Sequence, residues 1–307
     1  MAPFWEWEVP FIMSLQQGDP FWTPFFQILT LVGGEEFALL LGPFIYWCLS
    51  KEIGTGVVLT LVSSQIVNFG LKDLFHSPRP FQYDSHIPKL SDAAGYGLPS
   101  GHTQNTTVIW LYLATKLRRT WFWCLSAVLI LGVGLSRIYL GMHFPVDVIG
   151  GLLVGLVFLG LFVALEPTIK HQLERLSLGY QICGILLAGL CLGLLHPTSD
   201  FITMAALLTG GGVGFLVEST YMHFDVSGRW STKLLRYLVG LIGIALLWGG
   251  LKIAFAQISI TTLYIPLRAT RYGLVGLWGT WGAPALFMRL GLATHANTQD
   301  VGGAHIH

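Results

Sequence analysis

Apolar residues dominate the chain in long runs that short polar stretches separate. A helix that crosses a bilayer needs about 20 predominantly apolar residues, and the runs predict about nine such spans. They cover residues 24–49, 53–73, 101–117, 121–140, 145–165, 179–195, 200–218, 234–255 and 273–291. The pattern therefore predicts an all-α fold, a polytopic membrane helical bundle.

The start of the chain departs from this regular pattern. Gly33-Gly34-Glu35-Glu36 interrupts the first span and predicts a short helix, a break and then the span proper. Residues 1–23 predict a short amphipathic helix lying in the membrane interface, where Trp is enriched. Its large apolar side chains are Phe4, Trp5, Trp7, Phe11 and Ile12. No Lys or Arg precedes Lys51, so the segment lacks the basic region of a cleaved signal peptide.

Glycines on two spans suggest close helix contacts. Gly151 and Gly155 share the fifth span, and residues 210–214 on the seventh are also rich in glycine. Small residues let membrane helices approach one another closely. Glycine is also common in membrane helices in general. Both interpretations stay open, and the fifth span favours packing.

Composition agrees with membrane embedding. Of the 307 residues, 53% are hydrophobic and 11% charged, whereas soluble domains have about 25% charged residues. The net charge of +1 leaves no basic surface for nucleic acid. The four cysteines lie in apolar runs, which favours small buried hydrophobes over disulfides or metal ligands. They are Cys48, Cys124, Cys183 and Cys191.

Basic residues outside the candidate site predict the orientation. With nine spans, most of them fall on one side: Lys51, Lys116, Arg118, Arg119, Lys170, Arg175, Arg229, Lys233 and Arg236. The other side has Lys89, Lys252, Arg268 and Arg271. The positive-inside rule places the first group in the cytoplasm and the N-terminus outside.

Three polar blocks lie at span ends on the predicted outer side. Charge this close to apolar segments is costly and indicates a functional site. The first block supplies Lys72, at the end of the second span, and Arg79 in the loop that follows. Arg binds phosphate in bidentate fashion, and Lys acts as a point charge. Taken alone, Lys72 could equally be an interfacial lysine and Arg79 an ordinary loop residue.

The second block begins a helix. Ser100 precedes an apolar run and is a plausible N-cap. The first amides of a helix have no partner within it and form an anion site. Ser100 and Gly101 could present these N–H groups to a phosphate oxygen, with His102 beside it. Taken alone, an ordinary helix start is the more economical interpretation.

The third block pairs a histidine with a carboxylate. Arg137 ends the fourth span, and His143 and Asp147 lie four residues apart at the start of the fifth. Positions i and i+4 share one helix face. Asp147 can fix the tautomer of His143 and leave its other ring nitrogen free to attack. A pair that merely caps the helix is about equally plausible for this motif alone.

The ordered motifs resemble the type 2 phosphatidic acid phosphatase (PAP2) superfamily. They read Lys-x6-Arg-Pro, then Pro-Ser-Gly-His, then Ser-Arg-x5-His-x3-Asp, over about residues 52–165. The segment from Ser136 to Pro145 is similar to the sphingosine-1-phosphate phosphatase and glucose-6-phosphatase branches. The resemblance implies a catalytic core at 24–166 and further membrane helices at 167–292. The tail, 293–307, is expected to be disordered.

The resemblance also implies a role for each motif residue. His143 resembles a nucleophile that forms a phosphohistidine, oriented by Asp147. His102 resembles the general acid for the leaving oxygen. Lys72, Arg79 and Arg137, with the amides of Ser100 and Gly101, would hold the phosphate oxygens. No metal and no cofactor are implied, since these cations neutralise the charge.

The sequence thus predicts metal-independent hydrolysis of a lipid phosphate monoester or pyrophosphate. The substrate would come from the bilayer, membrane lipids would surround the protein, and vanadate would inhibit as a phosphate mimic. The short tail favours a bacterial inner membrane with the site facing the periplasm or exterior, or the lumen if the source is eukaryotic. Alternatives are a sugar-phosphate phosphatase and a non-enzymatic phospholipid or phosphate carrier. The oligomeric state stays open.

Overall fold

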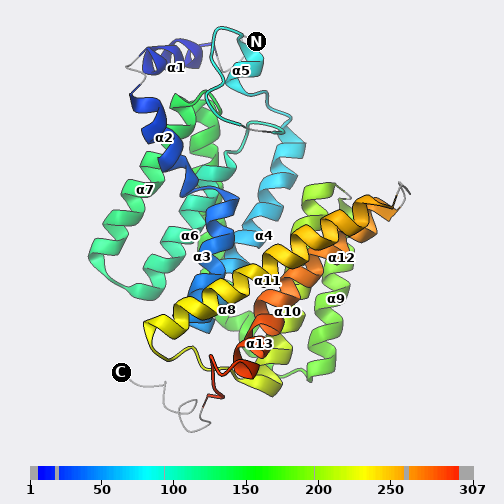
Figure 1. The fold of residues 1–307 in the computed structure, drawn as a ribbon. Helices are drawn as coiled ribbons and strands as arrows, with labels where there is room; N and C mark the ends of the chain where they lie inside the picture. Colours follow the sequence, from blue (N-terminus) through cyan, green and yellow to red (C-terminus); the bar gives the residue numbers. More distant parts are fainter. Residues whose placement is uncertain (1–5, 18–20, 93, 197, 259–262, 297–307) are drawn as a thin grey trace. The chain divides into compact units, whose positions relative to one another are not determined.

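Helices make up almost all of the described chain. The computed structural model describes residues 6–17, 21–92, 94–196, 198–258 and 263–296. Within these ranges the strand-like pairing is one isolated antiparallel bridge, between Phe224 and His295. The ribbon in Figure 1 contains helices and their connections. The prediction of an all-α fold is confirmed.

Six helices in the described residues are long and apolar enough to cross a membrane. They are α4 (Lys51–Phe75), α7 (Thr120–Tyr139), α8 (Pro145–Glu174), α9 (Leu178–Leu195), α10 (Ser199–Val217) and α11 (Trp230–Ala256). A seventh span results if α2 (Trp22–Leu31) and α3 (Glu35–Cys48) count as one, since they meet at a 45° bend. This bend confirms the predicted break at Gly33-Gly34, whereas the count of nine spans is not confirmed.

Two of the predicted spans are helical in the structure but are not both long and apolar enough to count as membrane-crossing helices. Helix α6 (Gly101–Leu117) has 17 residues, and its first half is polar. The last predicted span divides into α12 (Tyr264–Leu277), a π-helical turn η3 (Trp278–Gly282) and α13 (Ala283–Arg289). Helix α6 buries its polar face against protein, where side-chain hydrogen bonds replace contact with lipid.

The chain divides into two compact units. Unit 1 comprises Met1–Leu41 and Gly56–Thr168, and unit 2 comprises Gly42–Thr55 and Ile169–His307. The eight candidate site residues all belong to unit 1. The finer division into four segments stays a prediction.

Helix α6 is the buried centre of unit 1. Ten of its residues, between Thr103 and Ala114, are buried. Glycines on α8 allow this close packing: a Cβ on Gly151 would strike the carbonyl oxygen of Ser100, and one on Gly155 would lie 2.9 Å from Thr107 Cβ. The predicted role of these glycines in helix packing is confirmed.

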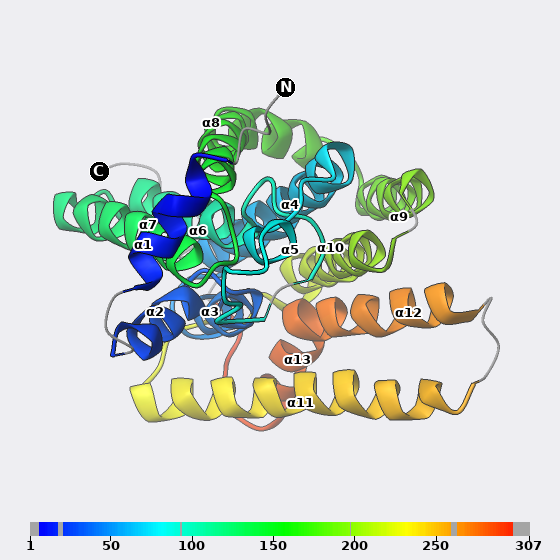
Figure 2. The ribbon, with the colours of Figure 1, turned by 90° about the horizontal axis from the view of Figure 1, so that it is seen from above.

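Helix α1 (Glu8–Gln16) packs onto unit 1 through one side. Val9 and Ile12 are buried with Ile87, Ile138 and Phe144. Seen from above, α1 lies beside α7 (Figure 2). Trp7 and Phe11 remain exposed, as an interfacial helix requires. Ile12, which was expected on the lipid-facing side, instead lies in the core; Phe4 and Trp5 lie outside the described residues.

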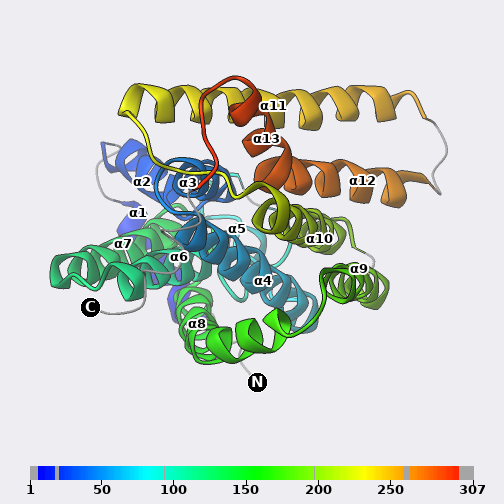
Figure 3. The ribbon, with the colours of Figure 1, turned by 90° about the horizontal axis from the view of Figure 1, so that it is seen from below.

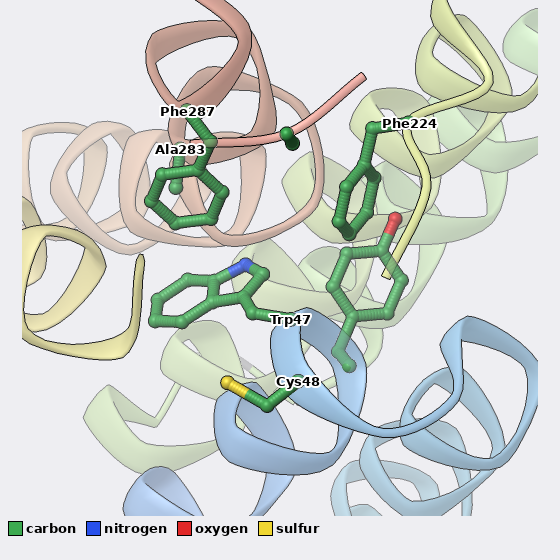
Figure 4. Close-up of a cluster of buried hydrophobic side chains, with 7 residues drawn as sticks. Trp47, Cys48, Phe224, Ala283 and Phe287 are labelled. Carbon is green, nitrogen blue, oxygen red and sulfur yellow. The ribbon is translucent and has the colours of Figure 1, made fainter. Parts of the chain in front are cut away.

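Unit 2 is built around aromatic packing. Trp47 and Cys48 of α3 contact Phe224, Ala283 and Phe287 in one buried cluster (Figure 4). The rings of Trp47 and Phe287 meet edge to face at 5.6 Å. Helix α10 packs against both α9 and α12, and α12 also contacts α11 (Figure 3). Glycine on α10 allows the close contact with α12, because a Cβ on Gly210 would strike the backbone of Gly273.

One acidic residue of unit 2 is buried with partners from distant parts of the sequence. Glu218, in the π-helical turn η1 (Glu218–Met222), is fully buried and pairs with Lys51 at 3.0 Å. It also accepts the backbone N–H of Phe224 at 2.7 Å. A buried carboxylate requires such partners. No sequence motif near Glu218 indicated that it would pair with Lys51, which lies 167 positions earlier.

The first residues of the predicted disordered tail are ordered. Thr294 accepts the N–H of Asp225 at 2.8 Å, and Ala296 donates to the carbonyl of His223 at 2.7 Å. His295 bonds the carbonyl of Met222 through its ring at 2.7 Å. The remainder of the tail, 297–307, lies outside the described residues.

The packing of α8 on α6 gives a first prediction. Gly155→Leu should destabilise the protein by about 1–3 kcal/mol, because Leu at this position overpacks the contact with Thr107. Gly160→Leu on the same helix is the matched control, since a Cβ there has no neighbour within 4 Å. Apparent melting temperatures in detergent compare the two. Equal melting of both variants would contradict the packing role.

Candidate functional site

The three polar blocks meet at one end of unit 1. Lys72 lies in the last turn of α4, Arg137 in the last turn of α7, and Asp147 in the first turn of α8. Gly101 is the first residue of α6. Arg79 precedes the short helix α5 (Pro80–Tyr83), which lies at the same end as α1 (Figure 1). The helix ends therefore gather all three motifs in space.

His143 and Asp147 form the predicted pair. Nδ1 of His143 lies 3.4 Å from Oδ2 of Asp147, and both side chains are buried. The contact is too poorly aligned for a hydrogen bond, and Nδ1 has no other hydrogen-bond partner among the described residues. Oδ2 of Asp147 also accepts the N–H of Phe144 at 3.0 Å. Catalytic hydrogen bonds are often long before substrate binds, so the geometry fits an orienting carboxylate.

The second ring nitrogen of His143 faces a cation. Nε2 lies 3.2 Å from Nη1 of Arg79. A guanidinium only donates, so Nε2 must accept, and the proton of a neutral ring lies on Nδ1, toward Asp147. Burial, with the nearby charges of Arg79, Arg137, Lys72 and His102, lowers the pKa of His143 well below its ordinary value. His143 is therefore neutral at pH 7, with the lone pair of Nε2 directed toward the cations.

Backbone carbonyls hold the Arg79 side chain in place. Its guanidinium donates to Ala94 at 2.7 Å, to Gly95 at 2.9 Å and to Met142 at 3.0 Å. Ala94 and Gly95 belong to the segment between α5 and α6. The contacts that this segment makes with Arg79 come from backbone carbonyls. The positive charge stays uncompensated by these contacts and is oriented toward His143.

The remaining cations lie nearby. Arg137 is buried and donates to Thr30 at 3.0 Å, while its Nε has no hydrogen-bond partner among the described residues. The charges of Arg137, Lys72 and Arg79 all act on His102, which places the four side chains in one electrostatic neighbourhood. Such a cluster attracts a multiply charged anion.

The start of α6 differs from the prediction in one respect. The N–H of Ser100 donates to the backbone carbonyl of Asp147 at 2.9 Å, so this amide is committed within the protein. The Ser100 hydroxyl makes no capping bond and instead accepts from Thr103 at 3.1 Å. Ser100 therefore joins α6 to α8, and of the two predicted amides that of Gly101 remains the candidate for anion binding. The reason is tertiary packing, which helix-capping rules do not include.

A buried amide network supports this helix start and was missed in the sequence. Asn68 donates to Gln104 at 2.7 Å and to the carbonyl of Pro99 at 3.3 Å. Gln104 in turn donates to the carbonyl of Ser64 at 2.8 Å. A Cβ on Gly101 would lie 3.4 Å from Oδ1 of Asn68 and 3.7 Å from Nζ of Lys72. Polar residues inside the second and third spans were the indication that could have revealed it.

Two further residues near Asp147 were also missed. Glu8 of α1 is buried and accepts the N–H of Val146 at 3.0 Å, which caps the start of α8. Burial raises the pKa of Glu8, and the bond from Val146 opposes this shift. Gly97 leaves room for the His143–Asp147 pair, since a Cβ there would lie 2.8 Å from Oδ2 of Asp147. An acidic residue in an apolar terminal segment was the only indication of Glu8.

The described residues hold no group of three or more His, Cys, Asp or Glu side chains that could bind a metal ion. Around His143 the charged side chains are mostly cationic, and cations bind phosphate directly. The arrangement can therefore bind a phosphate, attack it at phosphorus through Nε2 of His143 and protonate a leaving oxygen through His102.

Two family models match the chain. Residues 54–170 match the model described as PAP2 superfamily. Residues 202–295 match the model described as PAP2 superfamily phosphatase, transmembrane extension. The first match contains all eight candidate site residues, and the second falls within unit 2.

Individual proteins are similar over different lengths. Lipid phosphate phosphatase delta of Arabidopsis thaliana is 25% identical, covering 70% of this chain and 57% of that protein. The putative undecaprenyl-diphosphatase YbjG of Escherichia coli is 32% identical, covering 43% of this chain and 67% of that protein. Sphingosine-1-phosphate phosphatase 2 of Mus musculus is 24% identical, over 87% of each. A solved PAP2 type phosphatidylglycerolphosphate phosphatase from Bacillus subtilis is 21% identical with a TM-score of 0.48, over 55% of this chain and 89% of that one.

Fold and matches together define an integral membrane protein of the phosphatase class. The chain belongs to the PAP2 superfamily. It spans 57% of the Arabidopsis relative's length and larger shares of the other two.

The cap on α8 gives a second prediction. Glu8→Ala should lower stability by about 0.5–2 kcal/mol, because Val146 loses its acceptor. Glu8→Gln should lose less, since an amide oxygen still accepts. Glu6→Ala, an exposed neighbour, is the control. Melting in detergent measures all three, and a loss no larger for Glu8→Ala than for Glu6→Ala would refute the capping role.

Proposed function

We propose that this chain hydrolyses a lipid phosphate monoester or pyrophosphate, without a metal, through a phosphohistidine on His143. The observation that carries the proposal is the position of Nε2 of His143, 3.2 Å from the guanidinium of Arg79. Its Nδ1 faces Asp147. A nucleophile beside a phosphate-binding cation, with its tautomer set by a carboxylate, is the arrangement that nucleophilic catalysis requires.

The first chemical step transfers the phosphoryl group. Lys72, Arg79, Arg137 and the N–H of Gly101 bind the phosphate oxygens, and Arg79 exchanges its contact with Nε2 for an oxygen. The lone pair of Nε2 forms the N–P bond as the bond from phosphorus to the leaving oxygen breaks. Protonated His102 gives its proton to that oxygen, and Asp147 stabilises the charge on the His143 ring.

The second step returns the enzyme to its starting state. Neutral His102 takes a proton from a water molecule, whose oxygen attacks phosphorus as the N–P bond breaks. Inorganic phosphate leaves, and the proton acquired by His102 prepares it to act as the acid in the next cycle. The leaving group is an alcohol for a monoester and a phosphate for a pyrophosphate.

Several observations favour a lipid over a sugar phosphate as substrate. The similar proteins are described as acting on lipid phosphates, undecaprenyl diphosphate and sphingosine 1-phosphate. The reacting groups lie at helix ends, where an acyl or prenyl chain could remain in the bilayer while its headgroup reaches His143. We further propose a bacterial inner membrane as the location, with the site facing the periplasm.

Hydrolysis itself gives the third prediction. With EDTA present, the protein should release phosphate from at least one of phosphatidate, lysophosphatidate, sphingosine 1-phosphate and a prenyl pyrophosphate, with vanadate inhibiting. Removing the nucleophile in His143→Ala should abolish release, and His102→Ala should reduce it about 10²–10⁴-fold. His171→Ala, at the far end of α8, is the matched control.

The outcomes separate the alternatives. An acid-labile phosphoprotein intermediate in wild type, absent from His143→Ala, supports the phosphohistidine. Preference for glucose 6-phosphate over every lipid would favour the sugar-phosphate alternative. Phosphate movement across vesicles that survives His143→Ala would favour a carrier. A strict metal requirement, or no release from any substrate, would refute the proposal.

Sidedness gives the fourth prediction. In a background with all four cysteines replaced by Ala, Asp92→Cys should react with a membrane-impermeant thiol reagent in intact cells. Arg175→Cys should react only after permeabilisation, because the positive-inside rule places its loop in the cytoplasm. Both positions are exposed. The reverse labelling pattern would place the site on the cytoplasmic side.

A further inference from the structure

A second carboxylate lies close to the His143–Asp147 pair. Glu8 is the first residue of α1, and it is 1% exposed. Its Oε1 accepts the N–H of Val146 at 3.0 Å, and Val146 directly precedes Asp147. The charge of Glu8 acts on that of Asp147. Two buried carboxylates therefore share the start of α8.

Contacts along α1 fix the position of Glu8. Near the start of the helix, Val9 is buried in a cluster with Ile138. At its end, the side chain of Gln16 donates to the backbone carbonyl of Tyr139 at 2.8 Å. The Glu8 carboxylate is therefore held at a defined place near the start of α8.

Helix capping accounts for one oxygen of each carboxylate. Glu8 accepts the N–H of Val146, and Asp147 accepts the N–H of Phe144 at 3.0 Å. The positive end of α8 also stabilises negative charge nearby. A cap needs one acceptor and no charge, since Ser, Thr and Asn serve equally. Capping therefore does not explain why an ionisable side chain is buried at this position.

The other oxygen of each carboxylate is left over. Oε2 of Glu8 and Oδ1 of Asp147 are buried and have no hydrogen-bond partner among the described residues. A buried acceptor without a donor is costly, and two neighbouring carboxylates repel one another. This repulsion is relieved when positive charge forms close by, as it does on the His143 ring during the proposed attack on phosphorus.

The ring of His143 lies between unlike charges. Nε2 is 3.2 Å from the guanidinium of Arg79, and Nδ1 is 3.4 Å from the carboxylate of Asp147. A negative charge that acts on Asp147 makes this carboxylate a better acceptor for the Nδ1 proton. When the lone pair of Nε2 bonds to phosphorus, the ring becomes a cation that faces Asp147. Glu8 thus favours the charged ring over the neutral ring without touching the substrate.

We infer that Glu8 is a positioning residue for the nucleophile: acting through Asp147, its carboxylate holds the proton of His143 on Nδ1 and stabilises the phosphorylated ring. This inference rests on the proposed phosphohistidine chemistry. The N–P bond forms from the lone pair of Nε2, and the leaving oxygen takes its proton from His102. The Nδ1 proton stays between His143 and Asp147, and Glu8 neither gains nor loses an atom.

The test removes the charge and keeps the cap. Glu8→Gln retains an oxygen that accepts from Val146. Rapid-quench experiments follow phosphoprotein formation from the best hydrolysed of the four lipids above, labelled in its phosphate. The rate at saturating substrate should fall about tenfold, the effect of one pKa unit. The half-saturating concentration should stay unchanged, because Glu8 does not touch the substrate. Glu6→Gln, at an exposed neighbouring position, should match wild type.

The pH dependence separates the charge of Glu8 from its shape. Unprotonated His143 is the reactive form, so its protonation sets the acid limb of the rate profile. A nearby negative charge favours the protonated ring, so its removal in Glu8→Gln should move the acid limb to lower pH by about one unit. The other groups that act on the pair are the same in both proteins: Lys72, Arg79, Arg137 and His102. If Glu8→Gln keeps the wild-type rate and acid limb, and activity is lost only in Glu8→Ala, Glu8 is a cap alone and the inference is overturned.

A second measurement does not need turnover. In protein with isotope-labelled histidine, the Nδ1 proton of His143 is identified by its loss in His143→Ala. Its NMR resonance should lie downfield in wild type and move upfield in Glu8→Gln, because Asp147 becomes a weaker acceptor. An unchanged resonance, or none in wild type, overturns the inference whether or not the protein is a phosphatase. A shifted resonance without hydrolysis would support the effect of Glu8 on the ring and refute only the proposed function.

Discussion

The backbone bond between Ser100 and Asp147 is the constraint on which the site depends. It joins the start of α6 to the start of α8 at 2.9 Å. Gly101, the first residue of α6, follows Ser100, and His143, the candidate nucleophile, lies one turn before Asp147. A fixed distance between the two helix starts therefore fixes the distance between the amide of Gly101 and the ring of His143, the proposed phosphate ligand and nucleophile. The close approach of the helices requires glycine at position 151, whose Cα faces the Ser100 carbonyl.

Burial of several like charges opposes this geometry, and backbone carbonyls offset the cost. Arg79 is held by three carbonyls rather than by a carboxylate. Carbonyls orient a guanidinium without neutralising it, so its charge stays available for an anion. A carboxylate partner would have stabilised the empty site and weakened phosphate binding. Asp147, the acidic member of the cluster, instead faces Nδ1 of His143 and the N–H of Phe144.

Sequence spacing predicted the motifs well because each lies at a helix end. The periodic apolar runs located the helices to within a few residues, and polar residues at their ends identified Lys72, Arg137 and His143. Side chains that act through tertiary contacts were not predictable in this way. Glu8 reaches Val146 across 138 positions, and Asn68 reaches Gln104 across 36. The Ser100 amide was assigned to phosphate because capping rules consider one helix at a time.

The same limit explains why α6 was predicted as an ordinary span. Its polar residues face buried partners on other helices, and only the packed structure shows that Asn68 donates to Gln104. The network then matters for chemistry, because it fixes Asn68 and leaves its oxygen beside Gly101 and Lys72.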